Sequence, residues 1–204
     1  MPRFNASARL TKTQAVELLH GLIKNEVESR GKEMLVTPEL LSITNRVVDW
    51  LLGKGKRWLL FMGNVGDGKT TMLNAVQKFI ISMDIQKPYR EGHYSSWWAM
   101  YNATAKDLVT DYVKDPALIT QYNNVDVLGL DDMGAEPAET MVYGNPVYPI
   151  ADILMTRYKK DVQTIISTNL KANEIRPRYG DRIADRLNEM CERIVFPEQS
   201  YRTL

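Results

Sequence analysis

Hydrophobic side chains near the start of the chain recur at the spacing of amphipathic helices. Residues 11–30 carry apolar positions at three- and four-residue steps with charged residues between them, which predicts one helix ending before Gly31. A second helix is expected from Thr37 and Pro38, a cap residue followed by a proline in the first turn, to Gly53. The apolar stripes are Val16, Leu19, Ile23 and Val27 in the first helix and Leu40, Val47, Val48, Leu51 and Leu52 in the second. These helices either pack against the core, or the first one is an arm that docks onto a partner.

Beyond residue 57 the hydrophobic pattern changes to short continuous apolar runs, which are typical of buried strands. Helical patterns separate these runs, and strands that alternate with helices predict a parallel sheet. The expected strands are residues 58–62, 97–101, 125–130, 162–167 and 193–196, and the expected helices are residues 71–81, 105–114 and 146–158. A length of 204 residues suits one such α/β domain with a small appendage.

Two adjacent tryptophans, Trp97 and Trp98, open the second expected strand. Aromatic rings stack on bases in the channels of proteins that bind single strands. Neighbouring residues of a strand point to opposite faces, however, so at least one of the two rings is expected to face the core. Core packing is the better prediction for both.

The turn between the first strand and its helix fits the phosphate-loop pattern G-x-x-x-x-G-K-[ST] at every fixed position. Its glycines let backbone N–H groups face a phosphate, and the following helix directs the positive end of its dipole at the same anion. Lys69 adds a charge for the β- and γ-phosphates, and the Thr70 hydroxyl is a ligand for Mg²⁺. The predicted nucleotide-binding residues are Gly63, Asn64, Val65, Gly66, Asp67, Gly68, Lys69, Thr70 and Thr71. The alternative is a glycine-rich turn beside an exposed lysine, but the order of strand, loop and helix favours a nucleotide site.

An apolar run at residues 125–130 ends in two acids, Asp131 and Asp132. At the tip of a strand, Asp131 is placed to hold Mg²⁺ opposite Thr70. Asp132 is placed to orient or deprotonate the attacking water, a role more often taken by the longer glutamate. The alternative is an acidic strand end that faces solvent, and the phosphate loop upstream favours the catalytic interpretation.

Two further polar groups follow the later strands. The strand at residues 162–167 ends in Thr168 and Asn169, where a polar side chain beside the acidic strand can touch the γ-phosphate and the attacking water. Arg182 and Arg186 are four residues apart and share one helix face. These arginines either take part in catalysis or form a solvated face paired with Asp181 and Asp185.

Composition narrows the possible functions. The formal net charge is +1, from 26 basic and 25 acidic residues, so a nucleic-acid contact would have to come from a local patch. The single cysteine, Cys191, excludes an internal disulfide, and with two histidines no zinc cluster is expected. No apolar run approaches the roughly 20 residues that span a bilayer, and the start of the chain lacks a signal-peptide pattern. A cytoplasmic protein without membrane contact is the simplest expectation.

The order of the motifs resembles that of a known family. GNVGDGKTT, LGLDDMG, TIISTNL, RYGDRIADRL and the closing SYR are similar to the DnaC/DnaI helicase-loader and IstB transposition-helper ATPases of the AAA+ class, over about residues 38 to 204. The resemblance implies an α/β P-loop NTPase fold, with a five-stranded parallel sheet flanked by helices and the phosphate-loop strand central. It also implies a core at residues 37–204 without a C-terminal helical lid, preceded by a short helical arm at residues 1–36.

The same resemblance assigns roles to particular residues. Asn169 corresponds to the sensor 1 position. Arg182 and Arg186 lie in the segment that carries the arginine finger, and Arg202 matches a sensor 2-like arginine that binds the nucleotide. ATP and Mg²⁺ are the implied cofactors, with slow hydrolysis that depends on assembly of a homo-oligomer.

The implied function is DNA replication, as a helicase loader or nucleoprotein remodeller whose partner is a replicative helicase. The alternatives are an IstB-like transposition helper with a transposase partner, or a nucleotide-gated binding module that hydrolyses little ATP. Single-stranded DNA is expected to contact loops at residues 102–106 and 133–145, which include Lys106 and Tyr143. Helicase loaders usually carry a longer N-terminal domain, sometimes with a zinc site, and the short cysteine-free segment here departs from that pattern.

Overall fold

The computed structural model describes residues 2–88 and 96–197. In this part of the chain one parallel five-stranded sheet has the order β2-β3-β6-β1-β7. Its strands are β1 (Trp58–Met62), β2 (Met100–Thr104), β3 (Val127–Met133), β6 (Gln163–Thr168) and β7 (Cys191–Val195). The predicted parallel sheet is confirmed. The predicted central place of β1 is wrong: β6 is the middle strand and β1 lies between β6 and β7, because only one strand lies beyond β1 while β2 and β3 lie beyond β6.

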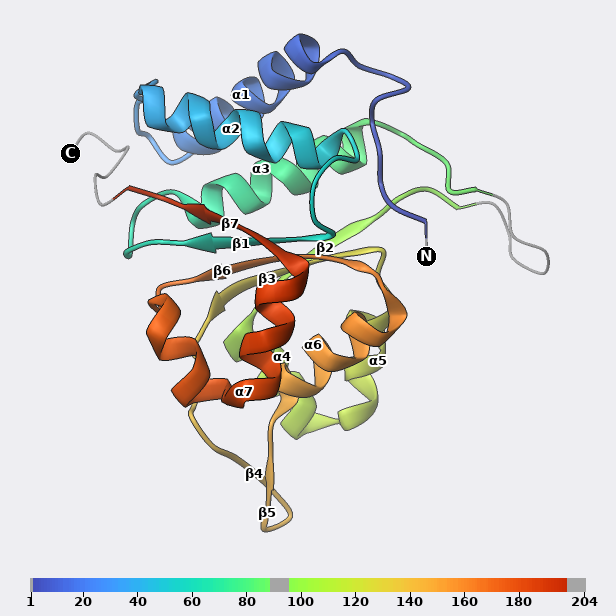
Figure 1. Ribbon diagram of the computed structural model, residues 1–204, viewed down its shortest axis with the longest axis vertical. Coiled ribbons are helices and arrows are strands. Elements are labelled where there is room, and N and C mark those ends of the chain that lie inside the picture. The colour runs from blue at the N-terminus through green and yellow to red at the C-terminus, as the bar shows by residue number, and fades with distance from the viewer. Residues whose placement is uncertain (1, 89–95, 198–204) are drawn as a thin grey trace.

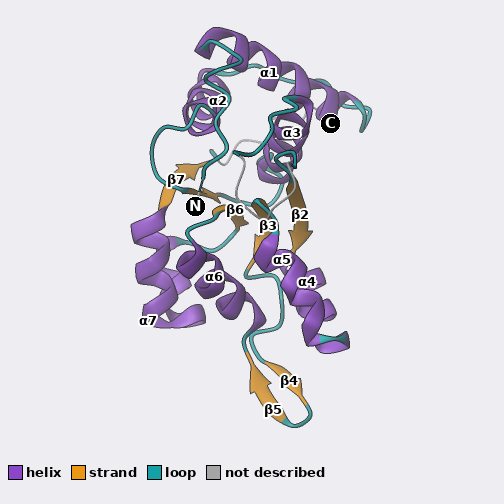
Figure 2. Cartoon of the chain, turned by 90° about the vertical axis from the view of Figure 1, so that its right-hand side faces the viewer, coloured by secondary structure: helices purple, strands orange, loops and turns teal. Residues whose placement is uncertain are grey.

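Helices cover both faces of the sheet (Figures 1 and 2). The upper face in Figure 1 carries α2 (Pro38–Leu51) and α3 (Lys69–Ser82), with α1 (Lys12–Glu28) lying across both as an outer layer. The lower face carries α4 (Ala105–Lys114), η1 (Pro116–Leu118), α5 (Ile119–Asn124), α6 (Pro149–Lys160) and α7 (Ala172–Met190). Both helices expected near the N-terminus are therefore present, and Thr11 and Thr37 cap them as their side chains accept backbone N–H groups.

The core divides into two clusters because the strands bury both faces. In β1 every residue is buried, with Leu59 and Phe61 in the upper cluster and Trp58, Leu60 and Met62 in the lower one. This alternation follows from the two-residue period of a strand. The continuous apolar run that predicted a buried strand thus contributes side chains to both hydrophobic clusters.

The N-terminal segment belongs to the upper core. Phe4 is fully buried and meets the Trp98 ring edge-on, with ring centroids 5.9 Å apart. Ala15, Leu19 and Ile23 of α1 are buried in the same cluster as residues of α2 and α3. The first helix therefore packs against the core, which was one of its two interpretations.

The second strand begins later than expected. β2 starts at Met100, which pairs with Val127, whereas Trp97 forms only an isolated bridge with Gln86. Trp98 is buried, but Trp97 is 51% exposed, so its predicted core packing is wrong. Since β2 runs directly into α4 through the cap residue Thr104, the loop expected at residues 102–106 is also absent from the structure.

A hairpin that the sequence did not predict follows β3. It consists of β4 (Thr140–Val142) and β5 (Asn145–Val147) and projects from the lower end of the molecule (Figure 2). Tyr143 and Gly144 form its two-residue turn, both with positive φ, as type I′ turns require. Residues expected to be a loop at 133–145 thus form an ordered projection, and the next helix begins at Pro149, because residues 145–147 are paired in β5.

Candidate functional site

The phosphate loop lies between β1 and α3, at the edge where the sheet strands end. Gly66 and Gly68 adopt positive φ, and α3 begins at Lys69. Asp67 is almost fully buried, and its carboxylate accepts the N–H of Asn64 across the loop. A Cβ atom at Gly63 would lie 2.7 Å from Oδ2 of Asp67, so only glycine fits there. The loop is therefore shaped by its own buried acid as well as by its glycines.

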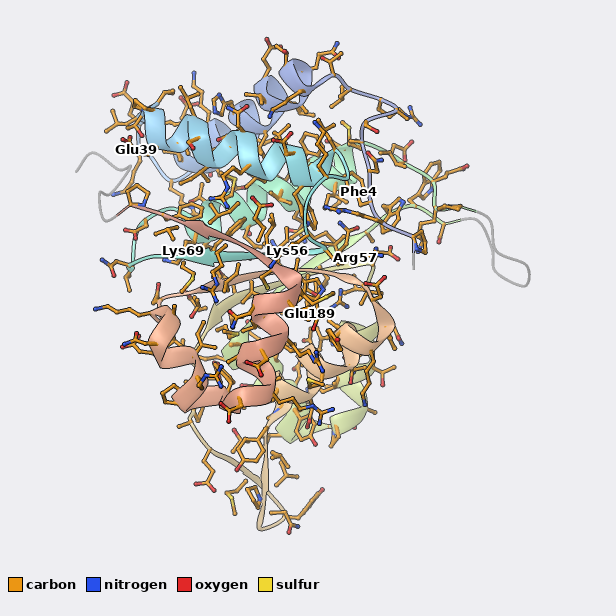
Figure 3. All side chains as sticks on the ribbon, in the orientation of Figure 1. Phe4, Glu39, Lys56, Arg57, Lys69 and Glu189 are labelled. Carbon is orange, nitrogen blue, oxygen red and sulfur yellow. The ribbon has the colours of Figure 1, made fainter. Side chains whose placement is uncertain are left out.

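Lys69 points back over this loop. Its ammonium group donates to the carbonyl oxygens of Gly63 at 3.1 Å and Asn64 at 2.6 Å, and the side chain is buried. Burial lowers the pKa of Lys69, while the carboxylates of Asp67, Asp132 and Asp131 raise it. Figure 3 shows Lys69 on the same side of the molecule as Glu39 at the start of α2, away from Arg57. The alternative of an exposed lysine is excluded by this burial.

The two acids lie at the end of β3, level with the end of β1. Thr168 pairs with Met62 on one side and Met133 on the other, so these strand ends are in register. The pairing of β3 with β6 shifts between Leu130 and Met133, and Asp132 in this bulge has φ of 54°. A bulge redirects the side chain of the extra residue, which is how β3 presents two consecutive acids near one edge.

Ser167 ties this acidic pair to β6. Its buried hydroxyl donates to Oδ1 of Asp131 and accepts the backbone N–H of Asp132 at 2.9 Å. Sequence reasoning included Ser167 only as part of a strand. The available signal was a hydroxyl at the end of an apolar strand beside the acidic one.

The acids differ in their surroundings. Asp131 is 7% exposed and bonded to Ser167, whereas Asp132 is half-buried. Burial raises the pKa of Asp132, the neighbouring Asp131 raises it further, and Lys69 and Lys106 lower it. Asp132 therefore holds its proton more readily than an ordinary aspartate.

The residues present fit a magnesium ion. Asp131 and Thr70 offer a carboxylate and a hydroxyl, the hard oxygen ligands that Mg²⁺ prefers. The described residues contain no group of three or more His, Cys, Asp or Glu that could hold a metal alone. This donor set suits Mg²⁺, which usually keeps water and substrate phosphates as its remaining ligands.

Asn169 joins the same edge. It is exposed, follows β6 and lines a hollow of about 360 Å³ together with Gly63 and Asn64. The turn that carries it is fixed by Thr168, whose hydroxyl donates to the Met133 carbonyl and accepts the Leu170 N–H. The structure thus brings Asn169 close to the phosphate loop.

The two candidate arginines lie on α7, beyond a kink at Gly180. Arg186 donates to Glu189 at 2.7 Å and stacks over the Tyr158 ring, 4.5 Å from its centroid. Arg182 is exposed and lines a different pocket, of about 440 Å³, which includes none of the phosphate-loop residues. Of the two, Arg182 is the less restrained.

The alternative interpretation paired these arginines with Asp181 and Asp185, and the described part of the chain does not form those pairs. Asp181 and Asp185 both pair with Arg176, at 2.9 Å in the case of Asp185. The kink at Gly180 interrupts α7 between Arg176 and these acids, which lie five and nine residues further on. Arg202 lies outside the described residues.

A second unpredicted contact holds α7 to the loop after β3. Glu136 is buried, accepts the Tyr179 hydroxyl and the Gly134 N–H, and faces Arg178. The segment that follows the acidic pair is therefore linked directly to the kinked helix.

The order of the sheet and the loop between β1 and α3 define the fold, which is an α/β P-loop fold of the AAA+ type. The chain is similar to the DnaC helicase loader, with a TM-score of 0.57 and 23% identity over 76% of this chain and 90% of that one. It is also similar to DnaI, with a TM-score of 0.62 and 14% identity over 87% and 94% of the two chains.

A third similar structure is the replication initiator DnaA bound to AMPPCP and single-stranded DNA. The TM-score is 0.55 and the identity 16%, over 79% of this chain and 46% of that one, so the likeness covers about half of DnaA. No family model matches the sequence, and no curated protein matches it either. Among the described helices none has the length and apolar character needed to span a membrane.

Proposed function

We propose that this protein binds and hydrolyses ATP and acts in DNA replication as a DnaC-like helicase loader or nucleoprotein remodeller. The observation that carries the proposal is the convergence of a buried lysine, two acids and a strand-tip asparagine on one edge of the sheet. The likeness to replication proteins of the AAA+ fold supports the biological setting.

The phosphate loop binds the phosphates of ATP in this proposal. Its backbone N–H groups and the start of α3 face the phosphates, and Lys69, released from two carbonyl oxygens, turns to them. Thr70 and Asp131 would hold Mg²⁺, which neutralises charge on the β- and γ-phosphates. Because burial removes water around Lys69, its charge is worth more here than at an open surface.

Hydrolysis requires a positioned water. Asp132 accepts a hydrogen bond from this water in its carboxylate form, and Asn169 fixes its position from the next strand. Ser167 holds both acids against β6 through one hydroxyl. Since no covalent intermediate is involved, the rate comes from positioning and electrostatics. Replacing Asp132 with Asn is expected to preserve ATP binding and stop turnover.

A neighbouring subunit completes the site in this proposal. Arg182 lies on α7, outside the phosphate-loop edge of its own chain, and an arginine finger supplied by another subunit raises the rate roughly 10³- to 10⁵-fold. Specific activity should then rise with protein concentration. A mixture of Lys69→Ala and Arg182→Ala proteins should regain part of the activity that each lacks, and Arg186→Ala serves as the comparison. If both arginine variants keep full activity at all concentrations, the trans arrangement is wrong.

Single-stranded DNA is a further proposed ligand. The hairpin tip carries Tyr143, which is 97% exposed and able to stack on a base. Residues 134–148 contain no lysine or arginine. In the two segments predicted to bind DNA, Lys106 on α4 is therefore the basic residue that can contact a phosphate. Binding should therefore be weak per subunit, with a salt slope of roughly 0.7 for each neutralised phosphate. Fluorescence anisotropy with ATP, ADP and no nucleotide tests the coupling, and equal binding in all three would contradict it.

An assay of complex formation with candidate partner proteins separates the functional alternatives. A helicase loader should form an ATP-dependent complex with a replicative helicase, whereas a transposition helper should form one with a transposase. A nucleotide-gated module predicts binding without measurable turnover, with or without single-stranded DNA.

A further inference from the structure

A small, partly enclosed pocket lies directly beside the phosphate loop. Its floor is the loop itself, at Gly66, Asp67 and Gly68, together with Thr71 and Met72 of α3. Its walls come from distant parts of the chain: Ile23, Val27, Met34, Leu40 and Phe196. In Figure 1 the end of α1 and the start of α2 lie above the edge where β1 ends, which is where these walls meet the loop.

The pocket is too small for a nucleotide base. Its volume is about 30 Å³, enough for about one or two water molecules. A nucleotide whose phosphates lie on the N–H groups of the loop must place its base against a neighbouring surface. The apolar walls of this pocket line the same hollow as Gly66 and Gly68, so they offer an apolar surface to a base beside the loop.

Part of the outer wall of the pocket comes from an exposed stretch of chain after α1. The first half of α1 is anchored by Ala15 and Leu19, both fully buried. After α1, residues 29–36 form a connector in which no residue is buried, and Val36 is 60% exposed. Met34 is half-buried, forms a single β-bridge and lines the pocket from this connector. Its unbranched side chain changes shape readily, and an exposed segment with few buried side chains opens at low cost.

The last turns of α1 are attached to α3 by polar contacts. Glu26 is buried and pairs with Lys78 of α3 and Arg30, and it accepts from Asn74 of α3 at 3.5 Å. The side chains of Lys78 and Arg30 are 54% and 40% exposed. Water can replace such contacts when the helix end moves, which a purely apolar contact would not allow as easily.

We propose that the last turn of α1 and the connector with Met34 form a gate over the nucleotide-base subsite. This inference rests on the proposed nucleotide-binding function. The phosphates bind to the loop with the gate closed, whereas the base enters only when the gate moves outward. Nucleotide binding then changes the surface around Leu35 and Val36, which are exposed on the same connector.

The gate is tested by comparing two ligands. AMPPCP with Mg²⁺ contains the base, whereas inorganic tripolyphosphate with Mg²⁺ engages only the phosphate loop. Calorimetry is run on the wild type, Met34→Ala, Val27→Phe and a control, Met83→Ala, which removes another half-buried methionine from the same core cluster. Met34→Ala should bind AMPPCP roughly three- to tenfold more tightly, because less of the affinity is lost to opening the gate. Val27→Phe should bind it at least about tenfold more weakly.

Tripolyphosphate affinity should stay within about twofold of wild type in all three variants. Hydrogen exchange supplies a second readout: AMPPCP, but not tripolyphosphate, should change exchange in residues 24–36. Unchanged AMPPCP affinity in both pocket variants, or equal effects on the two ligands, would overturn the gate and leave the phosphate site intact. If the wild type binds neither ligand, the proposed nucleotide site fails, and the gate fails with it.

Discussion

The side-chain hydroxyl of Ser167 bonds to both acids of the site and so joins them to the neighbouring strand. In Ser167→Ala the charge-assisted hydrogen bond to Asp131 is lost, and the backbone N–H of Asp132 loses its acceptor. A hydrogen bond to a charged group contributes about 1.5–3 kcal/mol, and a buried donor without a partner costs about 1–3 kcal/mol. Both losses come from one oxygen atom, and the structure around the missing hydroxyl can adjust to both at once, so the two contributions are less than additive. We therefore expect the free energy of unfolding to fall by about 2–4 kcal/mol.

The assay is thermal and urea unfolding, with Ser82→Ala as the matched control. Ser82 also donates one hydrogen bond, to the Phe79 carbonyl at 2.9 Å, but on the exposed end of α3. For a chain of this size, Ser167→Ala should lower the Tm by roughly 5–12 °C, and the control by about 2 °C or less. Ser167→Ala should also raise the Mg²⁺ concentration needed for half-maximal nucleotide binding, because Asp131 loses the hydrogen bond that orients its carboxylate. Equal stability of the two variants would refute the view that Ser167 holds the acidic pair.

Further predictions concern Asp132 and Arg157. Turnover should fall as the pH drops through the raised pKa of Asp132, at a pH above the ordinary aspartate value of 3.8, as a pH–rate profile would show. Since the native state holds that proton more tightly than the unfolded chain, ionised Asp132 opposes folding above this pKa. Asp132→Asn should therefore raise the Tm at pH 7 but not near pH 3, and a lower Tm at pH 7 would contradict the assigned shift. Arg157 is fully buried and donates hydrogen bonds to Thr164 and to the carbonyls of Tyr122, Val125 and Gln163. Arg157→Met should therefore lower the free energy of unfolding, measured with urea, by about 3 kcal/mol or more. A decrease below about 1 kcal/mol would argue against the structural role of Arg157.

The arrangement of the candidate phosphate site was predictable because its parts are fixed by short spacings and by sheet geometry. The loop motif sets which residues would surround bound phosphates, and the ends of parallel strands meet at one edge. Asp131 and Asn169, which are 38 residues apart by their numbers, could therefore be placed at one edge of the sheet from the sequence. The bulge at Asp132 could not, because it depends on the register between β3 and β6.

Features decided by tertiary contacts were not predictable. The hairpin turn places Tyr143 at positive φ, where Asn or Asp would have given a recognisable signal. The exposure of Trp97 depends on where β2 begins to pair with β3. Arg176 pairs with Asp181 and Asp185, the acids considered as partners of Arg182 and Arg186, because Gly180 breaks the helix. Strand order, finally, depends on packing between elements far apart in the sequence.

Calorimetric titration of AMPPCP with Mg²⁺ into the wild type and Lys69→Ala tests the proposed nucleotide site most directly. Lys54→Ala, which removes an exposed lysine paired with Asp49, is the matched control. Lys69→Ala should lose measurable binding, while Lys54→Ala should bind like the wild type. Thermal unfolding first establishes that both variants are folded. Equal affinity of the wild type and folded Lys69→Ala would contradict the assignment of this loop as the nucleotide site.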